Sequence, residues 1–190
     1  MELEKARAIA EELKERLELQ SDRIEIVDGI RRHKPEVSKI RLLCIPTEGK
    51  PIPLEYRDLV DSISDPLPEF EDTDPIDDEV TELMVEGVLG FRPKGRRAYG
   101  PKKKCMVHAP SGIDVDIFTT DNQCWAVALV VTTGGNTTNR RIATAAQRKG
   151  WRFRTSGDGF DTPDGHISCS TEREVFEAVG LPYLPPQQRE

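Results

Sequence analysis

An arginine turn followed by a cation-bearing strand is the part of the chain best suited to phosphate chemistry. Residues 28–32 read Asp-Gly-Ile-Arg-Arg, and a glycine beside two arginines can bring backbone N–H and guanidinium groups to a phosphate. The run VSKIRLLCI at residues 37–45 has the composition of a buried strand. Lys39 and Arg41 are two residues apart on it, so both side chains should point to the same face. Two cations on such a strand need anionic partners.

Charge is segregated along the chain, although the net charge of −7 is only moderately acidic. Residues 65–82 hold nine acids and no Lys or Arg, whereas residues 92–104 hold seven bases and no acid. No acid occurs between Asp121 and Asp158, where six bases accumulate. Basic blocks of this kind attract polyanions whatever the net charge is. The pattern favours nucleic-acid binding, while solvated charged faces are the plainer explanation of any one block.

The chain length of 190 residues allows one good core or two small subdomains. No apolar run approaches the roughly 18 residues that span a bilayer, so no membrane association is expected. The N-terminal helix lacks the apolar centre of a signal peptide. The cysteines are widely separated and form no C-x-x-C pair, which predicts unpaired thiols, a reducing cytoplasmic location and no zinc site. The four are Cys44, Cys105, Cys124 and Cys169.

The elements that must position these residues follow from periodicity. Leu3, Ala6, Ala10, Leu13 and Leu17 recur at helical spacing and predict a helix over 2–19. Strands are expected at residues 23–27 and 37–45, and again at 103–109 and 113–119 around a three-residue hairpin turn. Helices are expected at 54–63 and 78–89, with a proline-rich acidic loop between them.

The last third of the chain should form a smaller unit. The apolar run 125–131 fits a helix or a strand equally well. A glycine break precedes a helix at 137–149, which Asn136 or Thr137 can cap and Gly150 can end. A short strand is expected at 167–170, and Thr171-Glu-Arg-Glu174 is a capping box for a final helix.

Five motifs, in order, resemble the palm and thumb of family X DNA polymerases, the DNA polymerase beta-like branch of the nucleotidyltransferase superfamily. Residues 28–32 are similar to the family's Gly-Ser-x-Arg-Arg turn, and GPKKKCMV at 100–107 with Val115-Asp-Ile117 resembles its later palm hairpin. Thr133-Gly-Gly135 with Asn139-Arg140 resembles the elements where thumb meets palm. The tail TEREVFEAVGLPYLPPQQRE is the most family-like stretch.

The resemblance implies an α+β fold in two parts. These are a nucleotidyltransferase-type palm over residues 1–122, with a mixed sheet and helices on one face, and a small α+β thumb over 123–190. Larger family members carry N-terminal lyase and helix-hairpin-helix domains, for which these 190 residues have no room. The chain is similar instead to the minimal palm-thumb members of viruses.

The resemblance also implies a three-aspartate site for two divalent metals, which this sequence does not preserve. The third aspartate falls on Asp116, a register supported by its 18-residue distance to Gly134. The first two fall on Lys39 and Arg41. We therefore expect no metal or other cofactor. We also predict that Lys39 and Arg41 form ion pairs with Asp116, and also with Asp114, and that these pairs keep the former metal site electrically neutral. An exposed edge strand with two solvated cations is the alternative.

Other family positions imply where phosphate and DNA would bind. The family's triphosphate-binding serine falls on Gly29, so its hydroxyl is lost, whereas Arg32 keeps the family arginine. The residues expected to contact phosphate or nucleotide are Arg32, Gly29, Gly134, Gly135 and Asn139. The residues expected to contact DNA are Arg31, Arg96, Arg97, Lys102, Lys103, Lys104, Arg140 and Arg141.

These expectations lead to a DNA-binding, non-catalytic member of the family, with DNA as partner and nucleotide as a second ligand. An active minimal polymerase with a reduced or relocated site for Mg²⁺ or Mn²⁺ is the alternative. A protein-interaction module that uses the acidic segment 65–82 as a DNA mimic is a third hypothesis. The sequence leaves the oligomeric state undetermined.

Overall fold

The computed structural model describes residues 1–47, 75–93 and 99–190. The helix expected at 54–63, most of the acidic segment 65–82, and Arg96 and Arg97 lie outside these ranges. No helix among the described residues is long and apolar enough to cross a membrane.

A mixed sheet forms the larger part of the molecule, as expected. Its strands run in the order β1-β2-β6-β5-β3, with β4 paired to the end of β5. Only β2 and β6 among these pairs are parallel; the other pairs are antiparallel. The strands are β1 (Ser21–Ile26), β2 (Lys39–Pro46), β3 (Leu89–Phe91), β4 (Tyr99–Gly100), β5 (Lys103–His108) and β6 (Asp114–Thr119).

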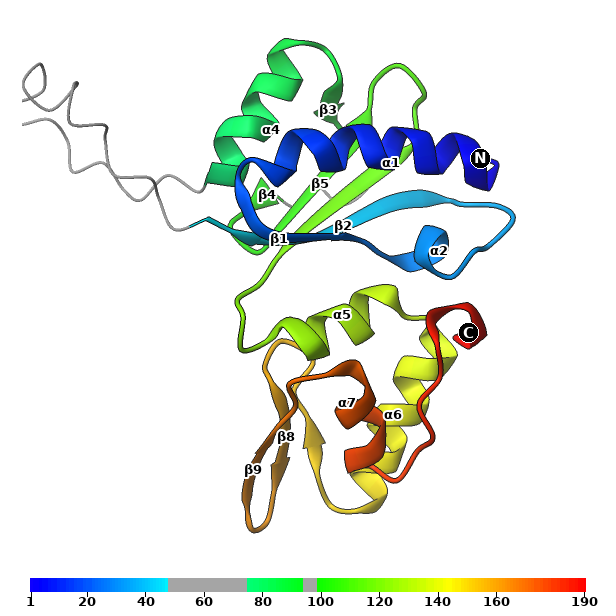
Figure 1. Cartoon of the computed structure of the whole chain (residues 1–190), viewed down its shortest axis with the longest axis vertical. Helices are drawn as coiled ribbons and strands as arrows, with labels where there is room; N and C mark the ends of the chain where they lie inside the picture. The colour runs from blue at the N-terminus through cyan, green and yellow to red at the C-terminus, as the bar shows by residue number, and fades with distance from the viewer. Residues whose placement is uncertain (48–74, 94–98) are drawn as a thin grey trace, which may run out of the picture.

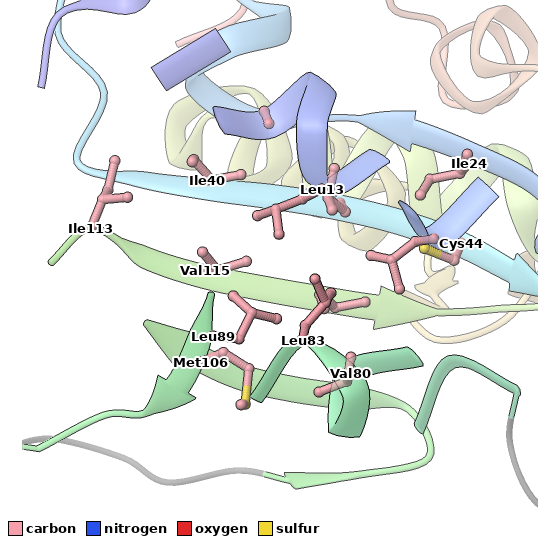
Figure 2. Close-up of a cluster of buried hydrophobic side chains, with 14 of the residues drawn as sticks. Leu13, Ile24, Ile40, Cys44, Val80, Leu83, Leu89, Met106, Ile113 and Val115 are labelled. Carbon is pink, nitrogen blue, oxygen red and sulfur yellow. The ribbon is translucent and has the colours of Figure 1, made fainter. Parts of the chain in front are cut away.

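Two helices cover one face of this sheet (Figure 1). They are α1 (Leu3–Glu18) and α4 (Pro75–Val85). Their apolar stripes bury Leu13 and Leu83 against Ile40 and Val115 of the two parallel strands, and Figure 2 shows this core. Alternation along a strand sends every second residue to the same face. The residues between the buried ones, including Lys39 and Arg41, therefore lie on the opposite face of the sheet.

The C-terminal part packs below that opposite face (Figure 1). The apolar run that fitted either helix or strand is helical: α5 (Trp125–Thr133) contacts the sheet through Trp125 and Leu129, which pack on Leu43 and Ile45. A second core forms around Phe160. The remaining elements are α6 (Asn136–Arg148), β7 (Arg152–Phe153), β8 (Gly159–Thr162), β9 (Gly165–Ser168), α7 (Glu172–Ala178) and the 3₁₀ turn η1 (Pro186–Gln188).

Several expected boundaries were wrong. The helix predicted to run to residue 89 ends at Val85, because Gly87 takes a left-handed turn (φ 75°) and Leu89 enters β3. A strand, β8, lies at residues 159–162, where none was expected. Neither residue expected to cap the second thumb helix does so: that helix has Gly135 at its N-cap position, with no side-chain cap hydrogen bond.

A short helix, α2 (Asp28–Arg31), takes the place of an open arginine turn. It follows β1 directly and leads into β2, so the arginine turn stands at the same end of the sheet as Lys39 and Arg41. The expected capping box is present at α7, where Thr171 Oγ1 accepts a hydrogen bond from the Glu174 N–H.

Candidate functional site: a cation cluster around Asp116

Asp116 is the centre of the site. It lies in the middle of β6 with only 1% of its side chain exposed. Its register partners are Arg41 on the parallel strand β2 and Cys105 on the antiparallel strand β5. A carboxylate this deeply buried needs compensating charge, because transfer of an uncompensated ion from water costs several kcal/mol or more.

Four cationic side chains surround that carboxylate. The Arg92 Nη2 atom donates to Oδ1 at 2.7 Å. The other oxygen, Oδ2, lies 3.5 Å from Arg41 Nε, 3.7 Å from Lys103 Nζ and 3.8 Å from Lys39 Nζ. The predicted ion pairs of Lys39 and Arg41 with Asp116 are therefore present. The alternative of two solvated cations on an edge strand is wrong, because β2 is an inner strand between β1 and β6.

Sequence reasoning missed two partners of Asp116: Lys103, which was expected to contact DNA, and Arg92. Arg92 follows β3, is 8% exposed, and also binds Asp114 (Nε–Oδ1 3.2 Å) and the Met106 carbonyl (3.0 Å). Asp114 thus pairs with Arg92 and not with the β2 cations as expected. The only sequence signal was the position of Arg92 at the start of the basic block 92–104.

The neighbouring cations keep the Asp116 carboxyl deprotonated. Burial alone would raise the pKa of its carboxyl, but the positive charges of Lys103 and Arg92, together with hydrogen bonds from Arg92 and Cys105, hold that pKa below its usual value. Asp116 is therefore ionised at neutral pH. Its single negative charge faces four positive ones.

The arginine turn is joined to the cluster through Asp28. One carboxylate oxygen of Asp28 pairs with Arg41 Nη1 at 2.9 Å and the other with Arg32 Nη2 at 2.8 Å. Arg32 also lies 3.4 Å from the Arg189 carbonyl oxygen. Gly29 is buried against Val37.

Arg31 faces the thumb and not solvent. Its guanidinium makes a bidentate pair with Glu172 (both distances 2.9 Å) and donates to Thr133 Oγ1 at 2.8 Å. Arg189, which is fully buried, binds the same Glu172 at 2.7 Å. The expected DNA-contact residue Arg31 is thus part of a palm–thumb ion network, and we leave it out of the DNA surface proposed below.

The glycine turn between α5 and α6 is filled by the end of the sequence. Gly134 has φ 63°. A Cβ on Gly135 would overlap the backbone of Glu190. The Thr138 N–H donates to the Glu190 oxygen (2.6 Å), and the Glu190 N–H donates to Thr138 Oγ1 (3.1 Å). These two hydrogen bonds, one between backbone groups and one to the Thr138 hydroxyl, take the role expected for a side-chain cap.

Asn139 is turned away from any external ligand. Its side-chain amide donates to the Val131 carbonyl at 2.9 Å, and its Oδ1 is buried without a hydrogen-bond partner in the described structure. The residues that the resemblance associates with nucleotide binding are therefore engaged within the protein.

The basic blocks differ in their accessibility. Arg140 and Arg141 are exposed on α6 and line an open groove of about 440 Å³ together with Arg148. Lys102 is exposed and Lys103 is half-buried beside Asp116. Lys104 is fully buried and pairs with Asp77 at 3.1 Å, so it cannot reach DNA as expected.

The residues present do not fit a two-metal centre. Mg²⁺ and Mn²⁺ need several oxygen ligands, whereas the strand positions beside Asp116 carry an ammonium and a guanidinium. Within the described ranges no group of three or more His, Cys, Asp or Glu residues could hold a metal ion. Each carboxylate near the cluster already binds arginine.

Together the sheet, the helical layer and the smaller α+β unit form a two-part α+β fold. Comparison with known proteins shows which proteins the chain resembles. Residues 128–190 match the family model described as DNA polymerase beta thumb. A segment of 87 residues is 29% identical to DNA polymerase lambda of Arabidopsis thaliana, covering 40% of this chain and 16% of the plant protein.

Two solved structures of Leishmania infantum polymerase beta share the fold. A ternary primer–template complex gives a TM-score of 0.71 and a ternary gap complex 0.74, each at 18% identity over 100% of this chain. The matches cover 76% and 70% of those chains. Residues 128–190 are thus similar to the DNA polymerase beta thumb, and the whole chain has the DNA polymerase beta fold, as the resemblance to family X predicted.

Proposed function

We propose that this family X-like protein binds DNA and does not carry out nucleotidyl transfer. The observation that carries the proposal is the charge at the palm site. Lys39 and Arg41 stand at the two strand positions that the family resemblance assigns to metal-binding aspartates, and both pair with Asp116, which the resemblance makes the third.

Electrostatics explains why metal-dependent chemistry is not expected there. Two metals activate the primer hydroxyl and neutralise the triphosphate in enzymes that use this chemistry. Two like unit charges about 4 Å apart repel by about 4 kcal/mol at an effective dielectric constant of about 20, and a divalent ion doubles that value. A metal ligated by Asp116 would lie close to several of its four cations, so repulsion would exceed the attraction of one carboxylate.

DNA binding is proposed through the thumb helix and the basic strand end. Arg140 and Arg141 are exposed on α6 beside a groove to which the described residues contribute no acidic side chain, and Lys102 is exposed before β5. Arginine side chains on such a surface can bind backbone phosphates. The polymerase beta structures that share the fold are complexes with primer–template or gapped substrates, which supports DNA as the partner. Arg96 and Arg97 also remain proposed DNA contacts.

The division into a palm (1–122) and a thumb (123–190) remains our proposal for the domain boundary. α5 begins at Trp125 and its buried face contacts both the sheet and the thumb core. These contacts support a boundary between β6 and α5, in the segment that precedes that helix, as we propose.

Primer extension separates the non-catalytic account from the alternative of an active polymerase. With gapped or primed DNA and Mg²⁺ or Mn²⁺, the protein should add no nucleotide above background. Robust incorporation that Asp116→Ala abolishes would establish the active alternative.

DNA binding is tested by a salt titration. Binding should weaken steeply with salt, because phosphate contacts release counterions. Arg140→Ala with Arg141→Ala should weaken binding and flatten the salt slope, whereas Arg7→Ala on α1 serves as a matched control. Failure to bind DNA at about 50 mM salt would remove DNA from the proposal.

A further inference from the structure

We propose that the cation cluster around Asp116 is a phosphate-binding site that works without a divalent metal. The proposal rests on the non-catalytic palm described above and names the ligand that this palm would take: a phosphate oxyanion, from the polyphosphate of a nucleotide or from a DNA backbone. Neutrality of the former metal site was expected from the sequence, whereas the charges of the described residues that pair there do not cancel.

The charges in the cluster do not cancel. Asp116, Asp28 and Asp114 provide three carboxylates, and five cationic side chains pair with them, which leaves an excess of two positive charges among these residues. The cations are Lys39, Arg41, Arg92, Lys103 and Arg32. An excess of this kind in a half-buried site attracts anions more strongly than the same charge on an open surface.

The excess is concentrated at one side of Asp116. Arg92 makes the close hydrogen bond to Oδ1, whereas Lys39, Lys103 and Arg41 Nε lie 3.5–3.8 Å from Oδ2, beyond the usual range of a hydrogen bond. Arg41 Nε has no hydrogen-bond partner in the described structure. Because Arg41 Nε is buried, the donors that remain for a further acceptor are the ammonium groups of Lys39 and Lys103.

The size of the cluster suits a phosphate group. Because Lys39 Nζ and Lys103 Nζ lie 3.8 and 3.7 Å from the same oxygen, they are at most 7.5 Å apart. A tetrahedral oxyanion between them can accept from both ammonium groups at about 2.8 Å. Lysine ammonium groups serve as point-charge phosphate ligands in other proteins.

Solvent reaches the cations but not the carboxylate. The side chains of Lys39 and Arg41 are each 28% exposed and that of Lys103 is 39% exposed, against 1% for Asp116. An incoming anion thus meets positive charge first. The buried Asp116 holds the cations together, and the four positive charges around it outweigh its repulsion of an anionic ligand.

Calorimetry with sodium tripolyphosphate in EDTA at low salt tests the site directly. The protein should bind one tripolyphosphate, and Lys39→Met with Lys103→Met should weaken that binding on the order of tenfold or more, because two charge-assisted contacts are lost. Lys5→Met with Lys14→Met removes the same charge from α1, on the far face of the sheet, and should leave the affinity within about twofold.

The double variant at the cluster should fold, because Asp116 keeps Arg92 and Arg41; an unchanged unfolding transition checks this. If that variant does not fold, Lys39→Arg with Lys103→Arg, which keeps both charges, should retain binding. Equal tripolyphosphate affinity in the Met variant and the wild type, or binding that requires Mg²⁺, would overturn the site.

The source of the phosphate is distinguished by competition. If the DNA backbone occupies the cluster, a gapped oligonucleotide displaces tripolyphosphate and the Lys39–Lys103 double variant binds DNA more weakly. If the cluster binds free polyphosphate instead, the oligonucleotide and tripolyphosphate should bind to the protein at the same time. Either result supports the site. Calorimetry in EDTA does not depend on catalysis, so a protein that binds tripolyphosphate and still extends primers would overturn only the proposed function.

Discussion

Among the individual residues, Asp116 matters most, because its buried carboxylate is neutralised by cationic side chains and not by metal ions. Asp116 is the shared partner of four cations, and its lowered pKa shows that their charge outweighs the effect of burial. Such a group stabilises the fold only while it is charged and paired.

Replacement of Asp116 by asparagine should destabilise the protein by about 3–5 kcal/mol, because four cations then face each other without their shared anion. Urea unfolding measures this loss. Asp114→Asn is the matched control, since Asp114 is 42% exposed and has one partner, and it should cost less than about 1 kcal/mol. Added phosphate should restore part of the stability of Asp116→Asn. Equal stability of the two variants would show that the cations do not need Asp116.

At the scale of elements, sequence patterns located the strands and helices that have clear periodicity. The parallel pairing of β2 with β6 brings Lys39 and Arg41 to Asp116, and the positions implied by the family resemblance were enough to predict these ion pairs. Arg92 was not predictable at Asp116, because it lies 24 residues away, outside any strand, and no spacing rule links the two. The strands β7 and β8 are too short, at 2 and 4 residues, to show alternation.

The contact of Glu190 with the start of α6 also had no sequence signal. Glu190 contacts α6 mainly through its backbone and from more than 50 residues away, so its side chain gives no indication of the contact. The one residue type that the contact requires is the glycine against which Glu190 packs. Gly135 is that glycine, and the segment around it had been interpreted through its family resemblance and its capping side chains.

Gly135→Ala should therefore displace the Glu190 backbone from α6 and destabilise the thumb by about 1–3 kcal/mol, the usual cost of overpacking. Thermal unfolding measures the effect, and Gly100→Ala is the control, since a Cβ at that position meets no atom within 4 Å. In a chain that ends at Arg189 the same Gly135→Ala substitution should cost much less. An equal cost in both chains would mean that the contact with Glu190 is not what excludes a side chain at this position.

At the scale of the whole molecule, the palm and thumb are joined by a buried ion network. Arg31 from the palm and Arg189 from the tail share Glu172 of α7, and η1 with its flanking residues passes beside both parts. Burial alone would raise the pKa of Glu172, but the two arginines hold it below its usual value. The network thus couples the two parts only while Glu172 is ionised.

Glu172→Gln should destabilise the chain by about 3–5 kcal/mol, because it leaves two arginines unpaired, one of them fully buried. Glu177→Gln on the same helix, which removes an exposed 3.5 Å pair with Arg173, should cost less than about 1 kcal/mol. Since the folded-state pKa of Glu172 is lowered from 4.5, its contribution is fully present above pH 4.5 and is lost as the pH falls through the folded value. In Glu172→Gln, the free energy of unfolding should no longer show the decrease at acid pH that protonation of Glu172 causes. If the variant loses the same stability at acid pH as the wild type, another group is responsible for that loss.

The central claim is that Asp116 holds cationic side chains in place of divalent metals. A crystal soaked in Mn²⁺ with a DNA substrate, read by anomalous scattering, tests this claim most directly. The account predicts no manganese peak within coordination distance of Asp116, with Lys39 and Arg41 still paired to its carboxylate. A peak at about 2.1 Å from an Asp116 oxygen, with those two side chains displaced, would contradict it.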